Sequence, residues 1–214
     1  MRLALHPNDP PAPVSRGSQQ IMGTIDGWKK LVAIVNSPSN GITFDCGVTR
    51  EMHGDPVEVC RWFASRDRIN HVHFRNVTVQ TPYERYTEVF LDEGENDMFA
   101  VMKELVKQKY SRLIYPEHPR GLDYDRERPG FRPQYPGGGG YAAYAFNVGY
   151  TRAMLQAAVS MANAKCRMPN VTGQLGCSRC PVCSWHPSRR WMRHPFRTTM
   201  SEVFVFSALP IRHC

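Results

Sequence analysis

The feature that most constrains the fold is an alternation of short apolar runs and longer segments of helical periodicity over residues 1–165. Each apolar run has the length of a β-strand, and each is followed by apolar residues at the three- and four-residue spacing of a helix. The expected strands are 3–6, 42–46, 71–77 and 112–117, and the expected helices are 24–36, 55–65, 97–110 and 141–160. Four consecutive strand–helix units predict an α/β fold with parallel strands.

Local signals support these elements. Asp55 followed by Pro56 is a typical N-cap with proline at the first helical position.

Four strand–helix units amount to half of an eight-stranded α/β barrel, which usually needs about 250 residues. Because Met1 directly precedes the first strand, we expect upstream units to be missing, so that the chain is a partial TIM barrel. An open four-stranded α/β domain is the alternative.

The pattern ends near residue 165, which predicts two regions, 1–165 and an irregular tail over 166–214. The tail has seven Arg, no Lys and one acidic residue, a net charge of +6 out of the chain's +8. The body is therefore nearly balanced, and nucleic-acid binding is not expected from it. The tail contains a plausible zinc cluster with incomplete spacing, and its composition also fits a sequence that was never selected for folding. The cluster comprises Cys177, Cys180, Cys183 and His186.

The remaining composition bounds the class of protein. No run of 18 apolar residues occurs, and the N-terminus lacks a secretory signal, so we expect a cytoplasmic protein without a membrane span. The seven cysteines are an odd number, which argues against a disulfide framework.

Four potential metal ligands lie at or near the ends of the expected strands: His6, Cys46, His73 and Glu117. The carboxyl ends of parallel strands open on one face, so these residues are expected to converge there. Two imidazoles, a thiolate and a carboxylate suit Mn²⁺, Fe²⁺, Co²⁺ or Zn²⁺.

Each residue also has a simpler interpretation. His6 can cap a turn, Cys46 can be a core residue, and Glu117 can pair with His118 at the surface. His71 competes with His73, because residues two apart point to the same side of a strand.

Several segments resemble the mannonate dehydratase family over residues 3–155, in the same order and spacing. The most specific are ALHPNDPP from Ala4 and HFRNV from His73; the others are NGITFDCG from Asn40, Asp97-Met98 and Pro116-Glu117-His118. The resemblance implies the C-terminal half of a TIM barrel of the xylose-isomerase-like kind. It also implies Mn²⁺ or Fe²⁺ and the dehydration of D-mannonate to 2-keto-3-deoxy-D-gluconate in hexuronate breakdown.

The resemblance also implies roles for individual residues. It makes His6, Cys46, His73 and Glu117 the metal ligands, although the family commonly has Asp at the position of Glu117. It makes His118 and Tyr141 the catalytic residues and places Arg75 and Asn76 where the substrate carboxylate is bound.

Dehydration at a carbon next to a carboxylate needs positive charge nearby and groups that move protons, which these residues and a divalent ion supply. The expected partners are a sugar acid and either a second copy of the chain or a missing half-barrel. Two other functions stay open: a sugar isomerase or epimerase on the same barrel, and a zinc- or nucleic-acid-binding protein acting through the tail.

Overall fold

In the computed structural model, the backbone is described for residues 1–167 and side chains for residues 1–164. The predictions for the tail therefore lie outside the described residues. They are the irregular region over 168–214 and the cysteine cluster at 177–186.

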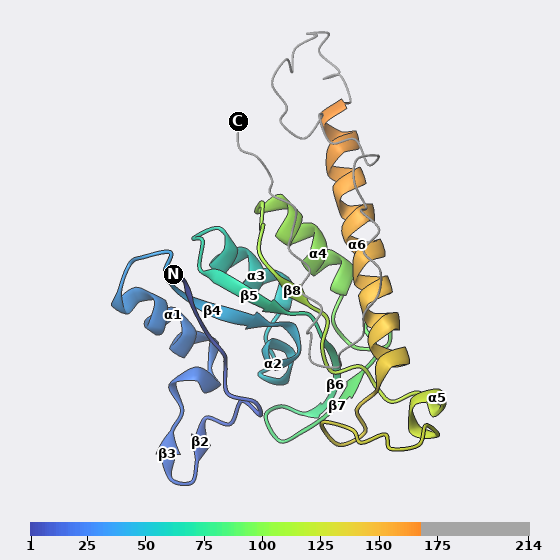
Figure 1. The fold of residues 1–214 in the computed structure, drawn as a ribbon. Coiled ribbons are helices and arrows are strands. Elements are labelled where there is room, and N and C mark those ends of the chain that lie inside the picture. The colour runs from blue at the N-terminus through green and yellow to red at the C-terminus, as the bar shows by residue number, and fades with distance from the viewer. Residues whose placement is uncertain (168–214) are drawn as a thin grey trace.

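The centre of the fold is a four-stranded parallel sheet in the order β1-β4-β5-β8, which confirms the prediction of parallel strands (Figure 1). The strands are β1 (Leu3–Leu5), β4 (Asn40–Asp45), β5 (Ile69–His73) and β8 (Ile114–Tyr115). Leu5 pairs with Ile42, and His73 pairs with both Asp45 and Tyr115, so the carboxyl ends of β4, β5 and β8 are level.

Helices alternate with these strands and pack along one side of the sheet (Figure 1). They are α1 (Ile25–Ile34), α3 (Pro56–Ala64), α4 (Met98–Lys107) and α6 (Tyr141–Arg167), which packs against α4. Thr24, Asp55 and Asp97 are the N-caps of the first three, each accepting a hydrogen bond from a backbone N–H of the first turn. Helix α6 continues past the predicted end at residue 160.

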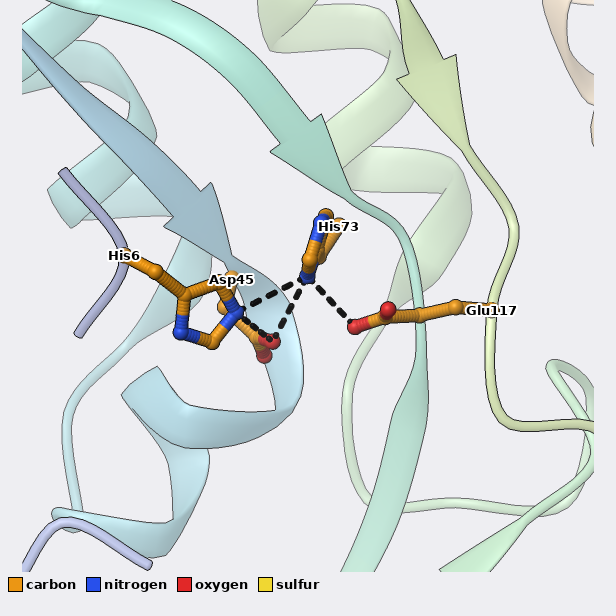
Figure 2. A group of neighbouring side chains, drawn as sticks. All are labelled: His6, Asp45, His73 and Glu117. Atoms are coloured by element: carbon orange, nitrogen blue, oxygen red, sulfur yellow. Dashed lines mark hydrogen bonds and ion pairs between the residues drawn. The ribbon is translucent and has the colours of Figure 1, made fainter. Parts of the chain in front are cut away.

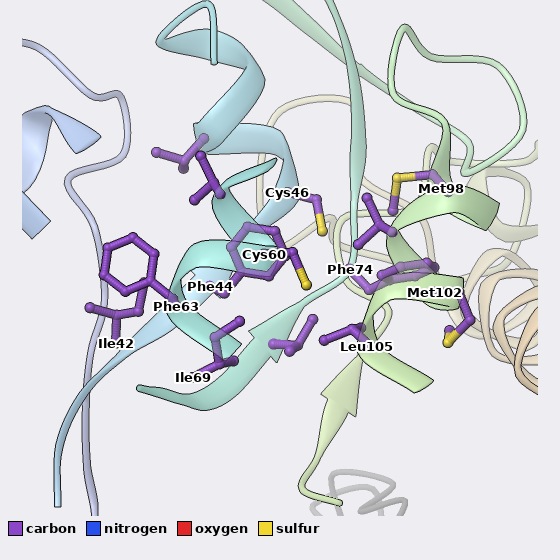
Figure 3. Close-up of a cluster of buried hydrophobic side chains, with 14 of the residues drawn as sticks. Ile42, Phe44, Cys46, Cys60, Phe63, Ile69, Phe74, Met98, Met102 and Leu105 are labelled. Atoms are coloured by element: carbon purple, nitrogen blue, oxygen red, sulfur yellow. The ribbon is translucent and has the colours of Figure 1, made fainter. Parts of the chain in front are cut away.

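One hydrophobic core lies between the sheet and these helices (Figure 3). Phe44 of β4, Phe63 of α3 and Met102 of α4 are fully buried in it. Further buried members are Ile42, Cys46, Cys60, Ile69, Phe74, Met98 and Leu105. Burial of this apolar surface is the main force that holds the helices on the sheet.

Smaller elements, not predicted from the sequence, follow the strands at their carboxyl ends. They are β2 (Val14–Ser15), β3 (Ser18–Gln19), η1 (Ile21–Gly23), α2 (Cys46–Glu51), β6 (Asn76–Thr81), β7 (Arg85–Val89) and α5 (Asp123–Arg126). The strand expected over 71–77 is divided, because the chain leaves the sheet after His73 and enters the β6–β7 hairpin at Asn76. None of the helices within residues 1–167 is both long and apolar enough to cross a membrane.

Candidate metal centre

Four side chains, one from each strand of the parallel sheet or the residues just after it, meet at the carboxyl end of the sheet (Figure 2). His6 follows β1, Asp45 is the last residue of β4, His73 is the last residue of β5, and Glu117 follows β8 by two residues. One potential ligand atom from each lies within 4.8 Å of every other. Three of the four, His6, His73 and Glu117, are residues that the sequence placed together.

The contacts within this group converge on one atom. Nδ1 of His73 lies 2.9 Å from Nε2 of His6, 2.7 Å from Oε1 of Glu117 and 3.6 Å from Oδ2 of Asp45. A ring nitrogen carries at most one proton, so it can donate to only one of these neighbours. Several lone pairs therefore face one another without a proton between them, and a cation bound among them would remove this repulsion.

The spacing also suits an ion. Ligands about 2.1 Å from a cation are roughly 3 to 4.2 Å apart in tetrahedral or octahedral coordination. Nε2 of His6 and Nδ1 of His73 lie 3.8 Å and 3.6 Å from Oδ2 of Asp45, within this range. The separations of Nδ1 of His73 from Nε2 of His6 and from Oε1 of Glu117, 2.9 Å and 2.7 Å, are slightly shorter and would widen around an ion. Two imidazole nitrogens and two carboxylate oxygens fit Mn²⁺ or Fe²⁺, so the residues present fit the expected metal.

The ring of His6 is oriented for this role by the residue after it. Its Nδ1 lies 2.7 Å from the carbonyl oxygen of Pro7, which can only accept a hydrogen bond. Nδ1 therefore carries the proton, and Nε2 presents its lone pair to the group. Metal-binding histidines are commonly held by such a second contact.

The electrostatics follow from burial and from the proximity of opposite charges. Burial lowers the pKa of His73, but its hydrogen bonds with Asp45 and Glu117 outweigh this effect and raise the pKa to about 9. Burial alone would raise the pKa of Asp45, yet the charge of Arg75 and the bond with His73 hold it well below its usual range. Burial raises the pKa of Glu117, and the negative charge of Asp45 adds to this.

Asp45 is the residue that sequence reasoning missed, and Cys46 took its place in the prediction. β4 ends at Asp45, whose Oδ1 accepts a hydrogen bond from the backbone N–H of Val48 at 2.7 Å and so caps α2. Cys46 therefore belongs to a helix and points the other way, into the core among Phe44 and Cys60 (Figure 3). The thiol is fully buried, and burial raises its pKa well above the usual value, which disfavours the thiolate that binds metal. Cys46 is not part of the group.

The two residues assigned to the substrate carboxylate are both buried and already engaged. Arg75 is 1% exposed, and its guanidinium forms ion pairs with five carboxylates. Asn76 donates to the carbonyl oxygens of Leu91 and Asn96 and accepts from the backbone N–H of Asn96, so it holds the loop between β7 and α4. A ligand would therefore have to compete with these partners for either side chain.

The two expected catalytic residues differ in their surroundings. His118 is half-buried, its Nδ1 is hydrogen-bonded to Glu88 of β7, and its ring is stacked on that of Tyr135 at a centroid distance of 4.5 Å. Burial lowers the pKa of His118, but the bond to Glu88 outweighs this and the pKa is raised. Tyr141 is the first residue of α6 and is 68% exposed. The contacts that Glu88 and Tyr135 make with His118 were not foreseen, because both join residues far apart in sequence.

Comparisons with known proteins agree with this geometry. The family model described as D-mannonate dehydratase (UxuA) matches residues 1–163. Mannonate dehydratase of Bacillus subtilis (strain 168) is 35% identical over 136 residues, which are 61% of this chain and 36% of that protein. The corresponding enzyme of Thermotoga maritima is 32% identical over 135 residues, 61% of this chain and 37% of the relative.

A solved structure shows the same relation in three dimensions. The crystal structure of mannonate dehydratase from Streptococcus suis serotype 2 matches with a TM-score of 0.65 and 27% identity, covering 75% of this chain and 44% of that one. The chain thus spans little more than a third of the length of its curated relatives. Because the family model matches most of its residues, the chain belongs to the D-mannonate dehydratase (UxuA) family.

Proposed function

We propose that this chain supplies the metal centre and the proton-transfer residues for dehydration of D-mannonate to 2-keto-3-deoxy-D-gluconate in hexuronate breakdown. His6, Asp45, His73 and Glu117 would hold Mn²⁺ or Fe²⁺. The observation that supports this most is the convergence of these four side chains from the four neighbouring strands of the sheet, in a member of this family.

The reaction removes a proton from C2 of the sugar acid and expels the hydroxyl group from C3. The C2 proton is only weakly acidic, because the charge left behind spreads into a carboxylate that is already negative. A bound divalent ion supplies the positive charge that stabilises this intermediate state. The protein must then provide groups that accept and donate protons beside it.

His118 is suited to proton transfer by its position. It directly follows Glu117, and its Nε2 lies 3.8 Å from Oε2 of that residue. Because Glu88 engages Nδ1, Nε2 is the nitrogen left to exchange a proton with the substrate. The stacked ring of Tyr135 fixes the plane of the imidazole.

Tyr141 is the second proton-transfer residue in this proposal. It follows a run of four glycines that joins the loop after β8 to α6, and its exposure leaves its hydroxyl accessible to a substrate. We assign proton transfer to the pair without dividing the roles of acid and base between them.

A sheet of four strands leaves its outer strands without a second neighbour within residues 1–167. On β1 the apolar side chains of Leu3 and Leu5 are 60% and 47% exposed. We propose that this segment is the C-terminal part of a xylose-isomerase-like TIM barrel, in the cytoplasm, and that a preceding half-barrel or a second copy of the chain pairs with the open edge.

The test is product analysis after incubation of the full chain with Mn²⁺ and D-mannonate. We expect 2-keto-3-deoxy-D-gluconate, reduced at least about a hundredfold by His118→Asn and by Tyr141→Phe. His53→Asn is the matched control, because His53 is exposed in the turn between α2 and α3. An isomerised sugar acid in place of the dehydrated product would favour the isomerase alternative, and absence of any product would contradict the proposal for this chain.

A further inference from the structure

We propose that Arg75 is a positioning residue of the metal centre: it fixes the candidate ligands Asp45 and Glu117 before the ion binds and, through Glu88, orients His118. This inference rests on the metal centre of the proposed function. It replaces the role in substrate binding that the sequence suggested for Arg75.

The surroundings of Arg75 are unusual for a buried side chain. Five carboxylates lie around one guanidinium that is 1% exposed. Nε lies 3.1 Å from Asp45 and 3.7 Å from Glu117, Nη1 lies 2.8 Å from Glu51 and 3.3 Å from Glu88, and Nη2 lies 3.1 Å from Asp9. A substrate carboxylate would have to displace one of these groups from a site that solvent does not reach.

The alternative use of such a cation is to hold the carboxylates together. Buried like charges repel strongly, because the interior screens them less than water does. Arg75 offsets this repulsion and fixes the direction of each oxygen, since its five N–H donors form a rigid planar fork. Asp45 and Glu117 are thereby kept close to His6 and His73, which reduces the cost of assembling the centre when the ion binds.

The same guanidinium reaches the residue proposed to transfer protons. Oε1 of Glu88 lies 3.3 Å from Nη1 of Arg75 and is also the atom that bonds to Nδ1 of His118. Arg75 and Glu88 therefore form a continuous link between the metal ligands and His118.

The backbone leaves space for this arrangement at Gly47, the second residue of α2. A Cβ atom at that position would lie 2.7 Å from Cζ and 2.8 Å from Nη1 of Arg75. Gly47→Ala should stabilise an unconstrained helix by up to about 1 kcal/mol. Here it would displace the guanidinium instead, so it tests the position of Arg75 without changing any charge.

The experiment measures the dissociation constant of Mn²⁺ by calorimetry for the full chain and for Arg75→Lys and Gly47→Ala. We expect both substitutions to weaken Mn²⁺ binding by about tenfold or more. Arg68→Lys is the matched control, because Arg68 is also buried, 6% exposed, but is hydrogen-bonded to Asn36 and lies just before β5, at the opposite end of the strand from His73. Its Mn²⁺ affinity should stay that of the unchanged chain.

A second measurement follows His118 in the metal-free protein. The proton on Nδ1 that bonds to Glu88 should give a strongly deshielded imidazole N–H signal in the proton NMR spectrum. Arg75→Lys and Gly47→Ala should shift or broaden this signal. Glu88→Gln should change the signal too but leave Mn²⁺ affinity nearly intact. If Arg75→Lys does not fold, Gly47→Ala tests the position of Arg75 and Glu88→Gln tests the link to His118.

The outcomes separate this inference from the proposed function. Unchanged Mn²⁺ affinity in Arg75→Lys or in Gly47→Ala would overturn the inference alone. No binding of Mn²⁺ by the unchanged chain would overturn the metal centre and the inference together. Weakened binding in both variants would support the inference even if D-mannonate gave no product, because neither measurement depends on turnover.

Discussion

The two faces of β4 differ sharply although both are buried. Phe44 points toward the helices. Asp45, the next residue, points toward the metal centre with His73 and Glu117, and both Phe44 and Asp45 are 0% exposed. The first face is stabilised by apolar packing. At Asp45 the second face is stabilised by the guanidinium of Arg75, the backbone N–H of Val48 and the imidazole of His73. Burial alone therefore does not distinguish a core position from a site position; the chemistry of the partners does.

The two faces also differ in how they are completed. The apolar face is covered by α1, α3 and α4 of the same chain. On the other face, His6 and His73 retain 39% and 16% exposure of their side chains, which is where a ligand can reach the group. The core is thus expected to determine stability and the group of four to determine metal affinity, largely independently of each other.

The largest effect should come from the apolar face. Phe44→Ala removes a fully buried aromatic ring from the centre of the core, and we expect it to lower the free energy of unfolding by about 3–5 kcal/mol. Chemical denaturation measures this change. The matched control is Tyr124→Ala, which removes an aromatic ring that is 59% exposed. Equal losses in the two variants would show that Phe44 is not in a packed core.

The next effect should come from the face with the metal centre. Asp45→Asn keeps an oxygen that can cap α2 but removes the ligand charge, and we expect Mn²⁺ affinity to fall about a hundredfold. Asp55→Asn makes the same change at the N-cap of α3, away from the group, and should leave affinity unaltered. Calorimetric titration of both variants decides the matter, and equal affinities would remove Asp45 from the ligand set.

The strands and most helices could be predicted because their signals are local. Apolar runs of strand length, and caps such as Asp55 and Asp97, depend only on neighbouring residues. The error at Asp45 arose from a one-residue difference in where β4 ends, and a shift of one residue changes the face on which a side chain lies. The alternation of apolar Ile42, Phe44 and Cys46 with polar Thr43 and Asp45 contained the information needed to avoid it.

The surroundings of Arg75 could not be predicted in the same way. Its partners include Asp9, which follows β1, and Glu88, which belongs to β7. These contacts depend on how separate loops meet above the sheet, and no periodicity or spacing in the sequence records that. The sequence indicates that Arg75 lies near the site but not that five carboxylates surround its guanidinium.

A smaller effect should appear in the dependence of metal binding on pH. His73 has a pKa of about 9 in the metal-free protein, above its usual 6.5, so it must lose a proton when an ion binds. Mn²⁺ affinity should therefore rise nearly tenfold per pH unit between pH 6.5 and 8.5. Calorimetry in buffers of different ionisation enthalpy should detect about one proton released per ion.

The stability of the metal-free protein should change in the opposite direction over the same range. A histidine whose pKa is raised by folding contributes stability that is fully present below its unfolded pKa of 6.5 and is lost as pH rises through about 9. Metal-free protein should thus become less stable while Mn²⁺ binds more tightly. An affinity that stays flat from pH 6.5 to 8.5 would contradict the assignment of His73 as a ligand.

The smallest effect should come from Cys46, which lies next to Asp45 but belongs to the opposite face. Cys46→Ala removes one buried sulfur atom, so we expect a loss of about 1 kcal/mol in the free energy of unfolding and no change in Mn²⁺ affinity. Cys60→Ala is the matched control, because Cys60 is a second fully buried cysteine in the same core. Similar stability losses and unchanged affinity in both would agree with a packing role for Cys46. Weaker Mn²⁺ binding in Cys46→Ala alone would mean that the thiol reaches the ion. That result would require the register of β4 to shift by one residue, since only then do Asp45 and Cys46 exchange faces.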